Sequence, residues 1–288
     1  MSCGRIALKK AKLPVDVYYA SEIKENAMEV TQYNYSDTNQ LGDVMELTTD
    51  ELKKLNIDLL IGGSPCQDLS IAMKNRTGLA GIKSKLFFEY VRVFKGLNPK
   101  YFLLENVGGM AKVDKDIITE IMGVEPIKIN SSLVSAQLRN RLYWTNIPGV
   151  AQPKDGGILL QSILDTGYTD REKARCILES ESRPLTTPIK MFHRYYSTGF
   201  TTLIFKDKKH YEDCKKHYDE NYKGMAAKDI ICNSDIYDGV RYFNQNELER
   251  LQTIPNGYTK ILNRNDAAGI LGDGWTADVI AHILSFIK

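Results

Sequence analysis

Residues 57–70 read IDLLIGGSPCQDLS and place a cysteine directly after a short apolar segment. The apolar residues at 57–61 predict a buried strand, which the two following glycines end. Pro65 fixes φ just before Cys66, so the turn holds the thiol in one direction. In an open α/β sheet, the loops at the carboxyl ends of the strands form the crevice where ligands bind. Cys66 is therefore a candidate nucleophile, although a buried cysteine that only packs is the ordinary alternative.

Two more polar segments adjoin predicted strands further along the chain. Residues 101–104 (YFLL) predict a second apolar strand, and the sequence Glu-Asn-Val comes directly after it. Residues 137–141 (QLRNR) precede a third predicted strand at 142–144. In this order and spacing, with SCGRIAL near the start and ELERLQTIPNGYT near the end, the sequence resembles the DNA cytosine-5 methyltransferases. These motifs are most similar to those of the catalytic domain of the animal de novo enzymes. The resemblance weakens between about residues 151 and 238.

The resemblance implies a covalent mechanism on a cytosine that has left the base stack of duplex DNA. Cys66 is implied as the nucleophile that adds to carbon 6, and carbon 5 then receives a methyl group from S-adenosyl-L-methionine, leaving S-adenosyl-L-homocysteine. Glu105 is implied to bind cytosine nitrogen 3, and Arg141 is implied to reach the carbonyl oxygen. Asn106 and Arg139 are implied to order the site. No metal is expected.

A carboxylate follows the strand predicted over residues 15–20. At the end of the second strand of a doubly wound sheet, Glu22 is placed to accept hydrogen bonds from ribose hydroxyls. An acid that stabilises the start of a helix is the ordinary alternative. Gly42 begins another predicted short strand, and the resemblance places the acid that follows it on adenine. The cofactor-binding residues implied in this way are Ser2, Cys3, Gly4, Glu22, Ile23, Asp43, Val44, Ser64, Pro65, Gly274 and Trp275.

Two regions are expected to contact DNA. Residues 67–84 are polar and too long for a simple turn, which predicts a lid whose basic residues meet phosphates, with a solvated surface loop as the ordinary alternative. Residues 151–238 correspond to the target-recognition region of the resembled family. Within it, the basic, aromatic and β-branched residues at 193–196 and 198–205 suit strands laid against DNA, or a hairpin with one core face. The DNA-binding residues predicted are Gln67, Ser70, Lys74, Arg76, Gln137, Arg183, Thr186 and Arg194.

The composition limits the classes of partner and site. Because 38 basic residues face 36 acidic ones, a DNA-binding face must come from the arrangement of charges. The five cysteines are odd in number and form no CxxC, so neither a disulfide framework nor a zinc knuckle is predicted. A reducing cytoplasm, in a bacterial cell or a phage-infected host, is expected. His210, Cys214 and His217 share one helical face, but a solvated face is favoured over a metal site. No apolar run approaches 18 residues, so no membrane span is expected.

We expect an α/β fold, the Rossmann-like doubly wound sheet of S-adenosylmethionine-dependent methyltransferases, with a small inserted target-recognition lobe. Residues 1–150 are predicted to form the first part of the catalytic domain, 151–238 the recognition region and 239–288 the return to the catalytic domain. In the resembled family a strand precedes the helix predicted over residues 5–11, and that strand is missing here. We expect its absence to expose the edges of two neighbouring strands and to weaken folding and cofactor binding.

The predicted activity is that of a DNA (cytosine-5-)-methyltransferase, a stand-alone bacterial or phage enzyme that acts on double-stranded DNA, with or without a cognate restriction endonuclease. An enzyme that methylates cytosine in transfer RNA is one alternative, since a relative with a similar cysteine motif acts there. A non-catalytic DNA-binding or partner subunit is another, if the missing strand abolishes cofactor binding. A nicotinamide-dependent dehydrogenase is disfavoured because no GxGxxG follows a predicted strand.

Overall fold

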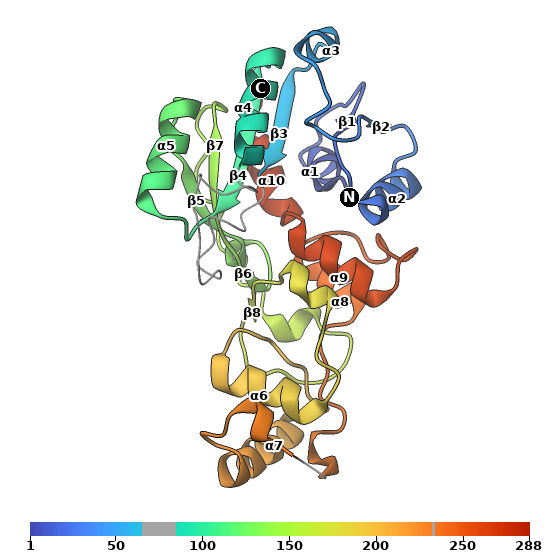
Figure 1. Ribbon diagram of the computed structural model, residues 1–288, viewed down its shortest axis with the longest axis vertical. Coiled ribbons are helices and arrows are strands. Elements are labelled where there is room, and N and C mark those ends of the chain that lie inside the picture. The colour runs from blue at the N-terminus through green and yellow to red at the C-terminus, as the bar shows by residue number, and fades with distance from the viewer. Residues whose placement is uncertain (65–84, 232–233) are drawn as a thin grey trace. The chain divides into compact units, whose positions relative to one another are not determined.

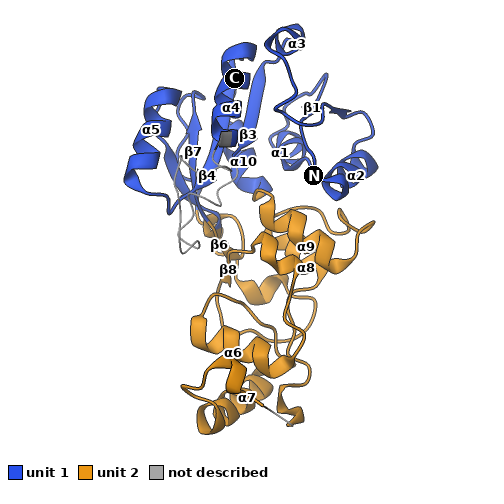
Figure 2. Cartoon of the chain, viewed as in Figure 1, with its two compact units in different colours: residues 1–131, 140–154, 277–288 blue, residues 132–139, 155–276 orange. Residues whose placement is uncertain are grey.

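The chain divides into two compact units. A computed structural model describes residues 1–64, 85–231 and 234–288 (Figure 1). Unit 1 comprises residues 1–131, 140–154 and 277–288, and unit 2 comprises residues 132–139 and 155–276 (Figure 2). Residues 239–276, expected to return to the catalytic domain, thus belong to unit 2. Six predicted site residues lie outside the described residues: Pro65, Cys66, Gln67, Ser70, Lys74 and Arg76.

Unit 1 contains two separate sheets. The larger has the order β3–β4–β7–β5, formed by Leu59–Gly63, Tyr101–Val107, Asn140–Thr145 and Ile127–Asn130. β3 runs parallel to β4, whereas β7 is antiparallel to both of its neighbours. The smaller sheet pairs β1 (Tyr19–Ala20) with β2 (Asn39–Gln40) in parallel. The α/β class expected from the sequence is confirmed, but the described strands do not join into one sheet.

The described helices of unit 1 lie between its strands and at both ends of its sequence. They are α1 (Cys3–Lys10), α2 (Glu25–Asn34), α3 (Thr49–Lys54), α4 (Lys85–Leu97), α5 (Lys112–Met122) and α10 (Ala277–Leu284). The start of α3 is fixed by Thr48 and Glu51, which form a complete capping box. The strand predicted from Gly42 is wrong: β2 ends at Gln40, and the chain turns at Gly42, whose φ is +70°.

The larger sheet is covered by an apolar core that fixes the middle strands. Phe102, Leu104 and Trp144 from β4 and β7 are buried in it together with Phe87 of α4 and Ile118 of α5. Six of the seven residues of β4 are buried, including the polar Glu105 and Asn106 near its carboxyl end. β4 is therefore the rigid centre from which the polar residues at its carboxyl end project.

Unit 2 contains little regular sheet. β6 (Gln137–Leu138) and β8 (Ala174–Arg175) form a short parallel pair. The helices are α6 (Pro188–Thr198), α7 (Lys208–Asn221), α8 (Gln245–Leu251) and α9 (Arg264–Asp273). Single 3₁₀ turns lie at η2 (Ser131–Leu133, shared with unit 1), η3 (Leu160–Ile163), η4 (Glu179–Ser182), η5 (Ala227–Asp229) and η6 (Asp235–Tyr237).

The strand suggested at residues 193–196 is wrong, because these residues lie inside α6. Pro188 occupies the first turn of this helix, where its fixed φ is favourable. Ile189, Phe192 and Tyr195 then recur every three residues on the buried side. This helical period outweighs the β propensity of the individual aromatic residues.

Helix α7 buries one face against the rest of unit 2. Both His210 Nε2 and Cys214 Sγ make hydrogen bonds to the Ile236 carbonyl, at 2.9 and 3.2 Å. Burial raises the pKa of the Cys214 thiol to about 12. His210, Cys214 and His217 do not form a metal-binding group, and the described residues contain no other group of three such side chains. No helix in the described ranges is long and apolar enough to cross a membrane.

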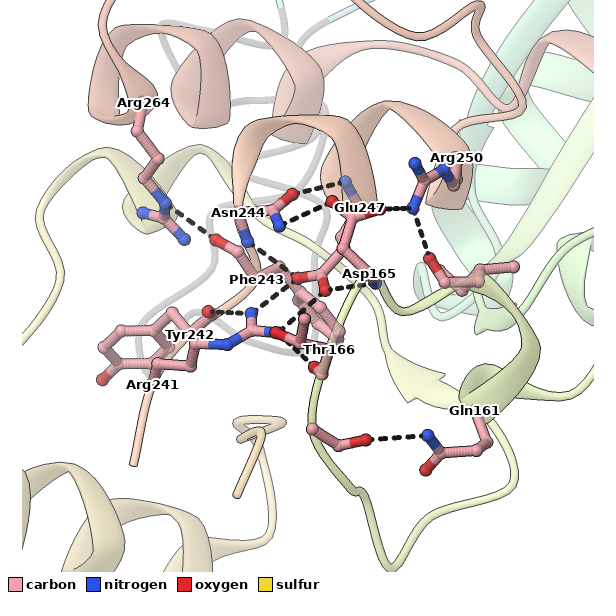
Figure 3. Close-up of polar contacts among 12 residues, drawn as sticks. Gln161, Asp165, Thr166, Arg241, Tyr242, Phe243, Asn244, Glu247, Arg250 and Arg264 are labelled. Carbon is pink, nitrogen blue, oxygen red and sulfur yellow. Dashed lines mark hydrogen bonds and ion pairs between the residues drawn. The ribbon is translucent and has the colours of Figure 1, made fainter. Parts of the chain in front are cut away.

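A network of charged side chains organises the amino-terminal end of α8 (Figure 3). The Arg241 guanidinium donates to both carboxylate oxygens of Glu247, at 2.7 and 2.9 Å. The same carboxylate accepts the backbone N–H groups of Asn244 and Asp165, at 2.9 and 3.0 Å. Asn244 caps the helix and forms a complete capping box with Glu247. Because the Glu247 side chain is fully buried, this pair joins residues 165, 241 and 247 into one rigid element.

Replacing Arg241 with methionine should destabilise the chain strongly. The Glu247 carboxylate stays buried but loses its cation, which typically costs about 3 kcal/mol. The measurement is the free energy of unfolding in urea. The matched control is Arg183→Met, which breaks the Glu179 pair while 70% of the arginine side chain is exposed, so it should cost less than about 1 kcal/mol. Equal losses of unfolding free energy in the two variants would contradict the inference that the buried Glu247 carboxylate depends on Arg241.

Candidate active site

The carboxyl ends of β3 and β4 lie next to each other and bring together residues far apart in sequence. Gly63 pairs in register with Glu105, so the residues that follow each of them are also neighbours. Asn106 is fully buried, and its Nδ2 donates to Ser64 Oγ at 2.9 Å. Its Oδ1 accepts the Val107 N–H at 2.8 Å. Asn106 therefore fixes the residue that immediately precedes the predicted Pro-Cys turn.

An ion pair between Glu105 and Arg141 joins β4 to β7. Arg141 lies opposite Val107 in the antiparallel ladder, so Glu105, two residues earlier, is its diagonal neighbour on the same face. Arg141 Nε lies 2.6 Å from Glu105 Oε1, and the two side chains are 11% and 10% exposed. Arg141 Nη1 also donates to the Asn140 carbonyl at 2.9 Å. The structure thus brings together the two residues expected to bind one base. About a tenth of each side chain remains exposed to solvent.

Arg139 has a different environment from Arg141, although only one residue separates them. It belongs to unit 2, where Nη1 donates to the Ile177 carbonyl at 3.1 Å and Nη2 to the Gly274 carbonyl at 2.8 Å. The same guanidinium also contacts Cys176 Sγ and the Gly272 carbonyl. Arg139 is almost fully buried, and these contacts tie it to the segments at residues 176–177 and 272–274 of unit 2.

Gln137 is a correction to the predicted DNA-binding set. It is fully buried, and its Nε2 donates to the Leu251 carbonyl at 2.6 Å and to Gln252 Oε1 at 2.9 Å. An amide with this burial and these partners does not present its polar atoms to a duplex. Gln137 thus connects β6 to the end of α8. The sequence pattern alone did not predict this contact.

Several predicted cofactor-binding residues follow the two short strands of unit 1. Glu22 Oε1 accepts the N–H groups of Ile23 and Lys24, both at 3.0 Å, at the start of α2. One carboxylate oxygen of Glu22 thus stabilises the start of a helix, which was the alternative to ribose binding. The side chain of Ile23 is 68% exposed. After β2, Asp43 Oδ1 accepts the Met45 N–H at 2.9 Å.

The start of α1 is packed against α2. Cys3 and Gly4 are buried, and Ser2 Oγ lies 3.1 Å from Thr31 Oγ1. The last two predicted cofactor-binding residues, Gly274 and Trp275, belong to unit 2. Ser2, Glu22, Asp43 and Ser64 thus share unit 1, on segments that follow its parallel strands or begin its first helix.

Arg92 is a residue that the sequence analysis missed. From α4, its Nη2 donates to the Val44 carbonyl at 2.7 Å and its Nη1 to the Leu47 carbonyl at 2.6 Å. It therefore clamps the loop that contains Asp43 and Val44. The only available signal was an arginine within an apolar helical segment, and its partners lie more than 40 residues away.

Three predicted DNA-binding residues are exposed in unit 2: Arg183, Thr186 and Arg194. Arg183 and Arg194 line one small depression together with Tyr242. Arg183 also makes two hydrogen bonds to the Glu179 carboxylate, at 3.1 and 2.9 Å. Glu181 lines the same depression, and burial raises the pKa of its carboxyl group. The depression thus combines two cations with one partly buried acid.

The fold is similar to that of solved methyltransferase structures. A DNMT2 variant from Spodoptera frugiperda superposes with a TM-score of 0.71 at 19% identity, over 99% of this chain and 96% of that one. The methyltransferase EhMeth of Entamoeba histolytica gives a TM-score of 0.69 at 15% identity, over 99% and 93% of the two chains. At such identities the similarity defines the fold alone.

The sequence comparison supports the same class of protein. Residues 2–125 match the C-5 cytosine-specific DNA methylase family. The Type II methyltransferase M.NlaIV of Neisseria lactamica is 36% identical over 242 residues, which are 77% of this chain and 54% of that protein. The orphan methyltransferase M.SPRI of Bacillus phage SPR is 32% identical over 238 residues, 78% of this chain and 51% of that protein. The chain therefore spans about half the length of these two relatives.

Removing either member of the Glu105–Arg141 pair should destabilise unit 1. Arg141→Met or Glu105→Gln leaves one buried charge without its partner, and each should lower the free energy of unfolding by about 3 kcal/mol. The double variant should lose at least about 1 kcal/mol less than the sum of the single losses, because the two residues are in direct contact. A double-mutant cycle in urea measures this coupling. Strictly additive losses would show that the pair does not stabilise the fold.

Proposed function

We propose that the chain transfers a methyl group from S-adenosylmethionine to carbon 5 of a cytosine in duplex DNA. The observation that carries the proposal is the Glu105–Arg141 pair at the end of β4, beside the Asn106–Ser64 contact. These contacts hold a carboxylate and a guanidinium on strands next to the residue that leads into the predicted nucleophile turn. The family match over residues 2–125 supports the same reaction.

The chain's own residues have distinct roles in the proposed reaction. The Cys66 thiolate attacks carbon 6 of the target cytosine, which makes carbon 5 electron-rich. Glu105, in its protonated form, donates its carboxyl proton in a hydrogen bond to nitrogen 3, and Arg141 donates to the carbonyl oxygen, so both stabilise the negative charge that develops on the ring. S-adenosylmethionine, when bound, supplies an electrophilic methyl group. Transfer of the carbon 5 proton to solvent water and departure of the thiolate restore the aromatic ring and the free Cys66. The attack requires access to the face of the ring, so the base must leave the duplex stack.

The residues of unit 1 fit a bound adenosyl group. Glu22 Oε2 makes no hydrogen bond among the described residues and is available to ribose hydroxyls, since only Oε1 binds the backbone. The exposed side chain of Ile23 offers an apolar surface for the adenine ring. Asp43 and Val44 lie in the loop that Arg92 clamps. We propose that these residues, with Ser2, Cys3, Gly4 and Ser64, hold the cofactor.

Unit 2 is the proposed region of target recognition. The predicted region at residues 151–238 lies almost entirely within it, and the exposed Arg183, Thr186 and Arg194 are proposed to meet DNA there. Residues 67, 70, 74 and 76 are proposed DNA contacts on sequence grounds. The names of the relatives include Type II and orphan methyltransferases. We therefore propose a cytoplasmic enzyme that acts alone or beside a cognate restriction endonuclease.

The full chain should transfer labelled methyl groups from S-adenosylmethionine to duplex DNA but not to transfer RNA. Cys66→Ala should abolish the transfer because the covalent addition to carbon 6 is lost. Cys232→Ala is the matched cysteine control and should retain activity. Covalent trapping on DNA that contains 5-fluorocytosine gives a second readout. Transfer to RNA alone would favour the transfer-RNA alternative, and DNA binding without any transfer would favour the non-catalytic one.

Glu105→Gln should slow the methyl-transfer step in single-turnover experiments by about 100-fold or more, because a group that acts in proton transfer or charge stabilisation contributes at least that factor. The equilibrium affinity for DNA, measured by fluorescence anisotropy, should change less than threefold. Thermal unfolding identifies any loss of folded protein. Parallel losses of affinity and rate would instead assign Glu105 to the fold.

A further inference from the structure

Phe200 is an apolar side chain that the fold of unit 2 leaves in solvent. It is 79% exposed, and among the described aromatic residues Tyr33 follows at 53%. Isolated apolar side chains are common on protein surfaces, so exposure alone assigns Phe200 no role. Its backbone and its charged neighbours distinguish it from such residues.

The backbone that leads into Phe200 is fixed by hydrogen bonds. Helix α6 ends at Gly199, which adopts a φ of +67°. The Gly199 carbonyl accepts hydrogen bonds from Arg175 Nε at 2.8 Å and from Arg171 Nη1 at 3.1 Å. The Phe200 N–H donates to Thr198 Oγ1 at 3.3 Å. Two guanidinium groups and one hydroxyl thus hold the peptide unit before the phenylalanine.

The backbone after Phe200 is anchored in the interior of unit 2. Thr201 and Thr202 are each 5% exposed, and residues 203–205 are buried. Thr202 Oγ1 also accepts the Arg175 N–H at 2.9 Å. The loop is therefore ordered before any partner binds, which lowers the entropy cost of binding through the one side chain that projects from it.

Exposed arginine side chains accompany this loop. Gly199 occupies only the Nε group of Arg175, so the two terminal nitrogens of that guanidinium make no hydrogen bond among the described residues. Thr201 lines the small depression together with Arg183 and Arg194. The Arg194 guanidinium likewise makes no hydrogen bond within the described ranges. Donors of this kind suit phosphate oxygens.

Two acids near the depression do not cancel this positive charge. The Glu179 carboxylate is already bound by Arg183, at 3.1 and 2.9 Å. Glu181 lines the depression, and burial raises the pKa of its carboxyl group, which favours the neutral form. The surface beside the projecting ring is thus predominantly positive, which is the charge that a nucleic acid requires.

An exposed aromatic ring between cations suits nucleic acid better than a protein partner. The ring can stack on bases while the guanidinium groups bind the backbone phosphates. A protein interface instead has a contiguous apolar centre. The sequence neighbours of Phe200 offer none, because Gly199 has no side chain and Thr201 is buried.

We propose that Phe200 inserts between two stacked base pairs of the duplex and selects a pyrimidine–purine step in the recognised sequence. The inference rests on the proposed function, which makes duplex DNA the substrate. An apolar side chain that enters the stack separates one step and kinks the duplex. Pyrimidine–purine steps are the easiest to unstack, so the cost of deformation itself discriminates between sequences. Arg175 and Arg194 bind phosphates beside this step, which is distinct from the target cytosine.

The test is selection of bound duplexes by the full chain from short DNA with a random central region. S-adenosyl-L-homocysteine is present, so that no methyl transfer occurs. Duplexes retained by the wild type should share a pyrimidine–purine step at a fixed distance from a common cytosine. Phe200→Ala should retain the cytosine without the step. Its affinity for the selected duplex should fall about tenfold, because a stacking contact is lost, whereas its affinity for a duplex lacking the step should be unchanged.

Three further variants separate stacking from other contributions. Phe200→Trp should keep the step preference, because a larger ring still stacks. Arg194→Gln should weaken binding to both duplexes alike and lower the salt dependence by about one phosphate contact. Phe88→Ala removes another exposed phenylalanine, from α4 in unit 1, and should leave both affinities unchanged. Thermal unfolding verifies that each variant is folded.

Several outcomes would overturn the proposal. They are the absence of DNA binding or of an enriched step in the wild type, and equal losses on both duplexes for Phe200→Ala. Self-association that Phe200→Ala abolishes, with DNA affinity unchanged, would assign the residue to a contact between copies. Enrichment of the step without methyl transfer in the separate activity assay would contradict the proposed reaction alone. Methyl transfer without enrichment would contradict only the role of Phe200.

Discussion

The buried ion pair between Glu105 and Arg141 is the constraint on which the candidate site depends. It ties β4 to β7 across the antiparallel ladder, close to the carboxyl end of β4. A buried pair gains little over apolar packing, because both charges lose their hydration. Replacing it with two apolar residues would keep the sheet but remove every charge from this position. The pair is therefore better explained by chemistry at the strand end than by stability.

The sequence predicted the strand ends of unit 1 better than the roles of the residues after them. The strands near residues 59, 101 and 140 were expected, because continuous apolar segments followed by polar residues are distinctive. The ordering of Ser64 by Asn106 was not, since the two positions are 42 residues apart and meet only through the β3–β4 register. Local sequence carries no information about such a contact.

In unit 2, the residues that cap a helix can be recognised in the sequence, whereas the packing of that helix cannot. The capping box of Asn244 and Glu247 can be seen in the sequence as an asparagine followed three residues later by a glutamate. The same Glu247 is fully buried and bound by Arg241, and the buried Glu249 accepts the N–H groups of Gly257 and Thr259 at 2.6 and 2.7 Å. Acids at an exposed helix start and acids in a buried network have the same spacing. Only tertiary structure separates them.

The break between β1 and β3 lies between two halves of the proposed site. Glu22 and Ile23 follow β1, whereas Ser64 follows β3. Among the described strands, no ladder of hydrogen bonds carries the position of one group to the other. Catalysis requires reacting groups to be held within fractions of an ångström. A strand that pairs with both edges would fix the adenosyl-binding residues and the nucleophile turn in one sheet. The distance between the methyl donor and the nucleophile would then be set by the same backbone hydrogen bonds that complete the sheet.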